Sequence, residues 1–191
     1  SAPNPAGSVT TPPGYREAYQ RFVEAGWPAI SFPEEWGGGG LPFVVGLAVA
    51  EMLTSADMAV SLGPMLTYAA DEVILLHGAD EQKAGWLPKL VSGEWTGTML
   101  LTESQAGSDV GALTTRAIPA GDGTFRITGQ KIFVTWGEHD LADNIVHVAP
   151  NRFCRETRRM IRCDSPSWRW PSCWLPRPYP RMRKAPRALA R

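Results

Sequence analysis

The sequence has little cysteine, and its spacing suits neither a disulfide framework nor a metal site. Only three cysteines occur in 191 residues (Cys154, Cys163 and Cys173), at intervals of nine and ten. An odd number cannot close a set of disulfides, and the spacing lacks the close CxxC pair of a zinc site. We therefore expect structural or incidental thiols and no metal.

Long apolar runs and several common motifs are also missing. No 18 consecutive residues are apolar, so we expect no membrane span, and residues 1–14 lack the basic and apolar regions of a signal peptide, which favours a flexible leader. There is no GxxxxGKS/T phosphate loop, HExxH pair or GxSxG elbow. Three scattered histidines (His77, His139 and His147) favour capping, turn or strand-face roles over metal binding.

Net charge is absent overall, since 19 Lys and Arg balance 19 Asp and Glu. Taken alone, this argues against a protein that binds nucleic acid or a membrane surface. The balance conceals two unlike parts. Residues 1–150 hold seven basic and 17 acidic residues, a net charge of −10, and all 19 glycines. Residues 151–191 hold 12 basic and two acidic residues, a net charge of +10, with no sustained helical or strand period.

Helical patterns occupy the first part of the chain. Residues 15–25 place apolar side chains at helical spacing, and residues 41–53 and 58–76 are apolar on nearly all sides, as in helices buried within a bundle. After the first of these segments, residues 27–42 hold too many prolines and glycines for regular structure, so we expect a long, shaped loop there. A fourth helix is expected to be capped by Asp80 and broken by the proline near its end.

The periodicity then changes to that of strands. Residues 95–101, 124–127, 131–135 and 145–148 are short and rich in β-branched or aromatic residues, with turn signals between them. The fold class expected is α+β, with an N-terminal all-α helical domain followed by the first strands of a β domain. The expected divisions are a leader at 1–14, a helical domain at 15–94, a partial β domain at 95–149 and an unassigned basic tail at 150–191.

A loop of small residues follows the first strand. The strand ends at Thr102, and Ala106, Gly107 and Ser108 then bring backbone N–H groups and a hydroxyl to the surface. Such a loop can bind an anionic or heteroaromatic ligand, because small side chains let the ligand approach the main chain. On these residues alone, an ordinary turn after a strand is equally open.

Several ordered motifs resemble the acyl-CoA dehydrogenases. Residues 101–109 (LTESQAGSD) resemble the family's flavin-site signature, and residues 127–135 (ITGQKIFVT) resemble its second flavin strand. The match runs from about Val9 to His147. Within the family, PPGY at 12–15 and the stretch at 137–147 are most similar to the 3-methylmercaptopropionyl-CoA dehydrogenase-like branch.

The resemblance implies that the strands begin a β-barrel-like middle domain, and it implies an oxidoreductase that uses FAD. In the family, a carboxylate removes the α-proton of an acyl-CoA while the β-hydrogen leaves as hydride to flavin, which gives a trans-2-enoyl-CoA. It also implies electron-transfer flavoprotein as acceptor, a homo-oligomer for the intact enzyme and a cytoplasmic, bacterial type of protein.

The resemblance assigns roles to individual residues of the two flavin motifs. Thr102 would bond the flavin edge, Ser108 would reach the FAD pyrophosphate and the CoA moiety, and Phe133 would cover the ring. Thr135 would bond near the reactive side of the ring. The implied cofactor residues are Met99, Leu101, Thr102, Gly107, Ser108, Phe133, Val134 and Thr135, with Ser108 also contacting substrate.

The family's catalytic carboxylate has no counterpart in this sequence. Glu103 and Glu138 stand at motif positions that are not the family's base, and nothing after Val148 resembles the C-terminal helical bundle that carries it. We therefore expect this chain alone to be inactive, with an unpaired sheet edge prone to aggregation. We expect residues from about Pro150 to be an out-of-frame translation or a mis-called terminus. Trp136 also departs from the family, which has a smaller or polar residue there.

Two alternative functions stay open at this point. An acyl-CoA oxidase would share the flavin loop but pass electrons to oxygen. A nucleic-acid-binding protein could use the basic tail, with binding that falls steeply as salt rises.

Overall fold

The computed structural model describes residues 2–3, 9–122 and 124–153. The expectations for the cysteines and for most of the basic tail therefore lie outside the described residues. The helices are α1 (Tyr15–Glu24), α2 (Phe43–Ala56), α3 (Met58–His77) and α4 (Asp80–Val91), with 3-10 turns η1 (Trp27–Ala29), η2 (Glu34–Trp36) and η3 (Val110–Ala112). The strands are β1 (Ala2–Pro3), β2 (Val9–Thr10), β3 (Trp95–Met99), β4 (Arg116–Pro119), β5 (Phe125–Thr128), β6 (Asn144–Val148) and β7 (Arg152–Phe153).

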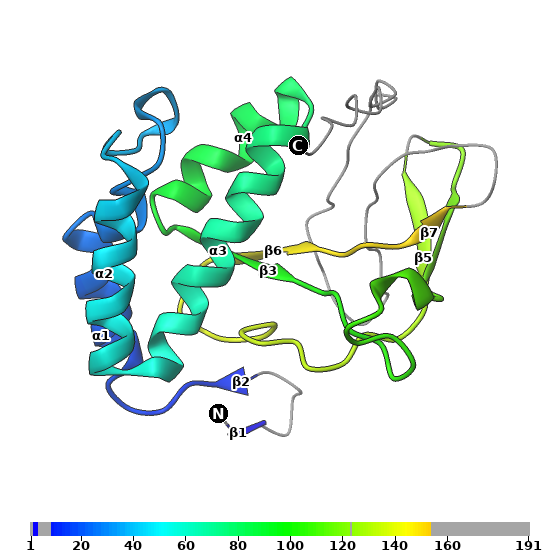
Figure 1. The fold of residues 1–191 in the computed structure, drawn as a ribbon, viewed down its shortest axis with the longest axis horizontal. Helices are drawn as coiled ribbons and strands as arrows, with labels where there is room; N and C mark the ends of the chain where they lie inside the picture. Colours follow the sequence, from blue (N-terminus) through cyan, green and yellow to red (C-terminus); the bar gives the residue numbers. More distant parts are fainter. Residues whose placement is uncertain (1, 4–8, 123, 154–191) are drawn as a thin grey trace, which may run out of the picture.

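The helices and the three-stranded sheet lie at opposite ends of the molecule. In Figure 1, α1 and α2 form one edge, α3 and α4 lie beside them, and β4, β5 and β7 stand at the far side. The parallel pair β3 and β6 runs between the two ends, with Trp95 opposite Asn144 and Met99 opposite Val148. In the three-stranded sheet the order is β5, β4, β7, with β5 antiparallel and β7 parallel to β4.

The main core is formed by α3, α4, β6 and the loop before α2. Its buried apolar side chains are Phe32, Ile74, Leu87, Leu90, Val91 and Val146. Burying one such side chain contributes roughly 1.5–3 kcal/mol. This core holds β3 and β6 against the helices and so fixes where the loop after β3 begins.

The helix α4 does not break at its proline, so that expectation was wrong. It continues through Pro88 to Val91, because Leu87 and Leu90 on either side of the proline are fully buried in the core. The packing of these side chains outweighs the cost of about 3 kcal/mol for a proline inside a helix. The N-cap is Ala79 rather than Asp80, and its backbone N–H donates to Oε1 of Gln82 at 2.9 Å.

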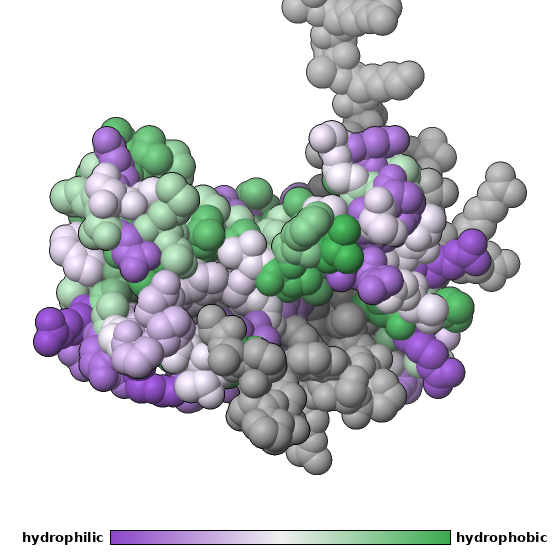
Figure 2. Space-filling view, turned by 90° about the horizontal axis from the view of Figure 1, so that it is seen from below, coloured by the Kyte–Doolittle hydropathy of each residue, from purple (hydrophilic) through white to green (hydrophobic). Residues whose placement is uncertain are grey.

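The helix α2 is apolar but exposed, so the expectation that it lies inside a bundle was also wrong. Four of its large apolar side chains are more than half exposed, at 62%, 67%, 55% and 62% for Phe43, Val44, Leu47 and Met52. Figure 2 shows this hydrophobic surface at the end of the molecule occupied by the helices. Within the described residues, α2 packs mainly against α3.

The helix α3 is long and apolar enough, by length and composition, to cross a membrane. Its apolar sequence is interrupted by Asp71 and Glu72, and 39% of its most apolar 18-residue stretch is buried in the fold. It packs against β3, α2 and α4, as the core helix of a folded domain does.

The expected strand at residues 131–135 is absent. Phe133 has φ 56°, a left-handed value that ends an extended run, and Gly129 before it has φ 156°. The preceding strand β5 does form, and it pairs with β4, which the sequence pattern did not indicate. The segment is instead tied to the loop after β3 by one backbone bond, from Ile132 N–H to the Thr102 carbonyl at 3.0 Å.

Candidate functional site

The loop after β3 is a tight turn closed on itself. Leu100 N–H still donates to the Val148 carbonyl at 2.8 Å, which extends the β3–β6 pairing by one residue. Glu103 and Ala106 then exchange two backbone hydrogen bonds, at 2.9 and 3.0 Å. Ala106 is buried beneath the turn, and Ser104 is exposed above it.

The buried carboxylate of Glu103 holds this turn in place through hydrogen bonds. Its carboxylate is 3% exposed and accepts hydrogen bonds from the N–H and hydroxyl groups of both Thr114 and Thr115. Gln105 Nε2 donates to it at 2.6 Å and Lys131 Nζ at 2.9 Å. Burial alone would raise the pKa of Glu103, but the hydrogen bonds from Thr115, Thr114 and Lys131 outweigh it and hold the pKa well below its ordinary value. A carboxylate so fully occupied is not available as a base.

The structure brings the two expected flavin segments next to each other. The Ile132–Thr102 backbone bond joins them, and Leu101, Phe133 and Val134 are exposed by 39%, 85% and 37%. Phe133 carries a large aromatic side chain on a left-handed backbone, a combination that costs energy. Packing of this side chain against the described residues does not offset that cost, because the side chain is exposed. These three side chains make an exposed apolar patch beside the turn.

The other expected residues lie on β3, on the turn after it and on the segment after Phe133. Met99 ends β3 and is half-buried, while Gly107, Ser108 and Thr135 are exposed. The backbone N–H groups of Gly107 and Ser108 find no acceptor among the described residues. A Cβ added to Gly107 would meet no atom within 4 Å. The turn therefore offers backbone donors that no described residue accepts, with open space beside Gly107.

Residues 138–140 lie in an irregular segment and make long-range contacts that the sequence did not indicate. Asp140 Oδ1 accepts from the N–H and hydroxyl of Thr11 at 3.1 and 2.6 Å, and Asp140 Oδ2 pairs with Arg16 at 3.2 Å. The hydrogen bond of Thr11 outweighs burial and lowers the pKa of Asp140 to about 2. His139 is buried and bonds Thr96. No local pattern could have indicated partners more than 40 residues away.

Trp136, the unusual residue beside the second flavin motif, packs against α3. Its Nε1 donates to the Ala59 carbonyl at 3.0 Å, and its ring lies 5.1 Å from that of His139 in an edge-on arrangement. The ring fills the space above Gly63, where a Cβ would come within 2.3 Å of it. Trp136 thus anchors the segment after Phe133 to the helices, which explains a bulky residue at this position.

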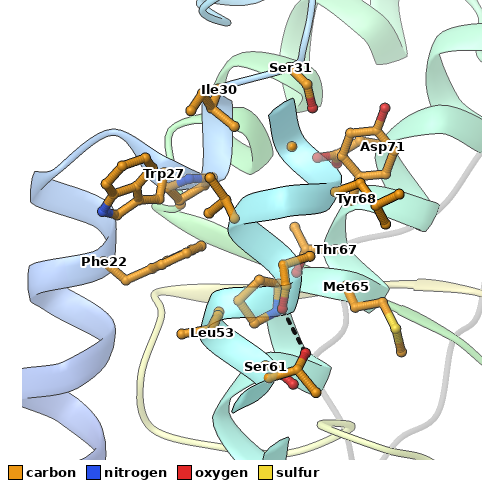
Figure 3. Close-up of a pocket in the computed structure, with 18 of the residues that line it drawn as sticks. Phe22, Trp27, Ile30, Ser31, Leu53, Ser61, Met65, Thr67, Tyr68 and Asp71 are labelled. Atoms are coloured by element: carbon orange, nitrogen blue, oxygen red, sulfur yellow. Dashed lines mark hydrogen bonds between the residues drawn. The ribbon is translucent and has the colours of Figure 1, made fainter. Parts of the chain in front are cut away.

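A separate cavity of about 260 Å³ lies among α1, α2, α3 and the η1 turn. Figure 3 shows Phe22 and Trp27 on one side of it and Met65 and Tyr68 on the other. Asp71 also lines it and is 4% exposed, and its Oδ1 has no hydrogen-bond partner among the described residues. None of the expected flavin residues lines this cavity.

Replacing Asp71 by Asn is expected to stabilise the fold by about 1–3 kcal/mol at pH 8. Burial, and then the charge of Glu72, raises the pKa of Asp71 well above its ordinary value. A raised folded-state pKa favours folding of the protonated form, so this stability is complete below the unfolded pKa near 4 and is lost as pH rises through the folded value. Thermal unfolding of both proteins at pH 5 and pH 8 should show the larger gain at pH 8.

The matched control for Asp71 is Glu72→Gln, which removes only the neighbouring charge and should give a smaller gain. An Asp71→Asn gain of equal size at both pH values would show that Asp71 does not titrate in the folded state.

Comparison with known proteins gives the following matches. Residues 8–94 match the family model of the acyl-CoA dehydrogenase N-terminal domain. The chain is 52% identical over 142 residues to the 3-methylmercaptopropionyl-CoA dehydrogenase of Ruegeria pomeroyi, an alignment that covers 74% of this chain and 24% of that protein. It is similar to the structure of butyryl-CoA dehydrogenase from Megasphaera elsdenii, with a TM-score of 0.62, 30% identity, and coverage of 69% of this chain and 35% of that one.

A second solved structure is an acyl-CoA dehydrogenase complexed with FAD from Bacillus anthracis, with a TM-score of 0.64, 27% identity, and coverage of 73% of this chain and 23% of that one. These likenesses confirm the α+β class, a helical N-terminal part followed by strands; the described strands form no closed barrel. The chain spans about a quarter of the length of the Ruegeria relative.

Proposed function

We propose that this chain, which belongs to the acyl-CoA dehydrogenase family, carries the flavin-loop side of an FAD-dependent acyl-CoA dehydrogenase in residues 9–149. The observation that carries the proposal is the adjacency of the Thr102 turn and the Phe133 segment, two motifs 30 residues apart in sequence that share one backbone hydrogen bond. The relatives described above are dehydrogenases, and neither an acyl-CoA oxidase nor a nucleic-acid-binding protein gains support from them.

The residues present fit FAD on three counts. The exposed patch of Leu101, Phe133 and Val134 offers apolar surface to a heteroaromatic ring. The N–H groups of Gly107 and Ser108, which no described residue accepts, are donors of the kind that phosphate oxygens accept. No side chain fills the space in front of Gly107, so a ligand can approach the main chain.

The chain's own residues would act by binding and orienting. Met99, Leu101, Phe133 and Val134 would line the ring, Thr102 and Thr135 would hydrogen-bond its edge, and Gly107 and Ser108 would hold the pyrophosphate, with Ser108 also reaching the CoA moiety. FAD, when bound, supplies the hydride acceptor. The exposed apolar side chains would exclude water from the ring, which would strengthen hydrogen bonds made there.

The reaction proposed for the whole protein is oxidation of the α,β C–C bond of an acyl-CoA thioester to a trans-2-enoyl-CoA. Its partners would be an electron-transfer flavoprotein and further copies of the same subunit, in a bacterial cytoplasm. The division into a leader (1–14), helical domain (15–94), partial β domain (95–149) and tail (150–191) is part of the same proposal. Because Glu103 is saturated by hydrogen bonds, it is not available as the base. Residues 1–191 alone should therefore bind FAD without oxidising acyl-CoA.

Titration of the purified chain with FAD tests this function. We expect flavin fluorescence to change saturably, and we expect acyl-CoA to leave the flavin absorbance unbleached. The first two substrates to add are 3-methylmercaptopropionyl-CoA and butyryl-CoA, because the relatives are named for them. Absence of any FAD binding would refute the proposed site, and rapid bleaching would refute the claim that this chain lacks the base.

Replacing Gly107 by Ala should weaken FAD binding at least tenfold without loss of stability. The added methyl group meets no atom of the chain within 4 Å, so it costs the fold little. It would stand where a ligand approaches the backbone, and a clash there opposes binding. Fluorescence titration gives the dissociation constant, and thermal unfolding gives the stability.

Gly85→Ala is the matched control for Gly107→Ala. Gly85 lies in α4, also with open space around its Cβ position, and alanine there should raise helix stability by up to about 1 kcal/mol. It should leave the FAD dissociation constant unchanged. Equal affinities in the two variants would remove Gly107 from the proposed site.

A further inference from the structure

A buried ion pair between Glu103 and Lys131 ties three segments of the chain together. The side chains are 2% and 10% exposed, and the Nζ to Oε1 distance is 2.9 Å. Lys131 Nζ also donates to the Leu101 carbonyl at 3.2 Å and to the Pro150 carbonyl at 3.0 Å. All three N–H donors of the ammonium therefore have acceptors. These are the Leu101 carbonyl and the Glu103 carboxylate in the loop after β3, and the Pro150 carbonyl just after β6.

Each partner of this pair lies next to a residue of the proposed flavin site. Glu103 follows Thr102, and Lys131 lies two residues before Phe133. Between the two partners runs the Ile132 N–H to Thr102 carbonyl bond. The Glu103 carboxylate is in turn fixed by four donors from Thr114 and Thr115, so its position does not depend on Lys131 alone.

An ion pair this deeply buried needs a reason other than stability. Desolvation of two charges opposes their attraction, and buried pairs can often be replaced by apolar residues of similar volume at no cost. What an apolar contact would not supply is a fixed direction, since the ammonium sets three acceptor positions at once. Residues 131–134 form no strand, so their placement rests on this ammonium, on one backbone bond and on the Trp136 anchor that follows them.

We propose that Glu103 and Lys131 are a positioning pair that sets the spacing between the Thr102–Ser108 turn and the Ile132–Thr135 segment, so that both face one flavin. This inference rests on the proposed FAD site. Neither side chain touches the cofactor, and the pair acts through the residues on either side of it.

The first test compares Lys131→Met with Lys89→Met in the full 191-residue chain. Lys89 pairs with Glu94 at 3.2 Å, but both side chains are nearly half exposed and lie on the helical side. We expect Lys131→Met to raise the FAD dissociation constant at least 30-fold and Lys89→Met to change it less than twofold. Lys131→Arg keeps the charge and should rescue part of the affinity.

A destabilised control separates positioning from general loss of stability. Leu87→Ala opens a cavity in the helical core, away from the turn, and lowers stability without touching the pair. Measured well below its unfolding temperature, Leu87→Ala should bind FAD like the unchanged chain. If it loses as much affinity as Lys131→Met, or if folded Lys131→Met binds FAD normally, the positioning role is wrong.

Two further measurements keep the test decisive. If Lys131→Met does not fold, Lys131→Arg decides, with an expected loss of about fivefold; an unchanged dissociation constant overturns the proposal. If the unchanged chain binds no FAD, the proposed function fails, and amide hydrogen exchange then judges the pair by itself. The Ile132 amide should exchange at least tenfold faster in the Lys131 variants than in Lys89→Met, and equal rates would overturn the positioning role.

Discussion

Replacing Gly38 by Ala is expected to destabilise the chain by about 3 kcal/mol or more, which is the upper range for forcing one extra carbon into a packed site. A Cβ at Gly38 would lie 2.0 Å from the Phe32 carbonyl oxygen and 2.3 Å from its carbon. These are backbone atoms, so no rotamer change relieves the clash. For a domain of this size, the unfolding temperature should fall by roughly 10 °C.

The clash matters because the loop folds back upon itself. Gly38, Gly39, Gly40 and Leu41 donate backbone hydrogen bonds to the carbonyls of Pro33, Ala29, Phe32 and Ile30. Moving the glycines would break these bonds and displace the Phe32 side chain, which is 1% exposed in the main core. The damage therefore reaches the core and is not confined to the loop.

The adjacent Gly37 provides the control for Gly38→Ala. It has φ 88°, and its Cβ position is free of neighbours, so Gly37→Ala costs only the left-handed backbone conformation, about 1–2 kcal/mol. Thermal unfolding of both variants should place Gly38→Ala clearly below Gly37→Ala. The reverse order would mean that the loop does not close on Phe32 as described.

Local patterns in the sequence sufficed for most of the helices and for the position of the loop after β3. Apolar spacing placed α1 within one residue of its observed end, and the proline and glycine content of residues 27–42 indicated a loop. These features depend on neighbours in the chain, so composition reveals them. The resemblance to the family added the pairing of the two flavin motifs, which the Ile132–Thr102 bond makes visible.

What the sequence did not reveal depends on distant partners. An apolar pattern all round α2 looks the same whether or not other elements cover it, and here it is exposed. The Lys131–Thr135 run has strand composition, but the contacts of Lys131 and the left-handed backbone of Phe133 determine its shape. The proline in α4 is tolerated only because Leu87 and Leu90 are buried, which no local rule could show.

Acid should unfold the chain through two buried histidines, the second large effect. Burial lowers the pKa of His139 to about 4 even though the charge of Asp140 raises it. Burial, and then the charge of His139, lowers the pKa of His147 to about 3. Both sit against buried threonines of β3, with His139 Nε2 3.0 Å from Thr96 Oγ1 and His147 Nδ1 hydrogen-bonded to Thr98.

The geometry around His139 explains why the neutral ring is required. Its Nδ1 accepts the N–H of Leu141 at 3.2 Å, so the ring proton lies on Nε2, facing Thr96. A second proton on Nδ1 would break the bond to Leu141 and bury a positive charge. The folded state therefore disfavours the charged form.

The sign of the effect follows from the lowered pKa. The unfolded chain takes up protons near pH 6.5 and the folded chain only near pH 4 or below, so stability is complete above pH 6.5 and falls as pH falls toward 4. His139 alone should cost about 3 kcal/mol at pH 4, with a similar cost from His147, and the two together are an upper limit. Protonation of Asp71 acts in the opposite direction, because its pKa is raised in the folded state.

Asp71→Asn is therefore the best background for measuring this loss, because it removes the opposing titration. In that background, urea unfolding from pH 7 to pH 4 should show stability falling steeply, and His139→Asn should reduce the slope by about one proton between pH 6 and pH 4.5. The Asp71→Asn chain with His139 intact is the reference for this comparison. Equal slopes with and without His139 would mean that this ring takes up its proton in the folded protein, against the buried neutral state that its hydrogen bonds require.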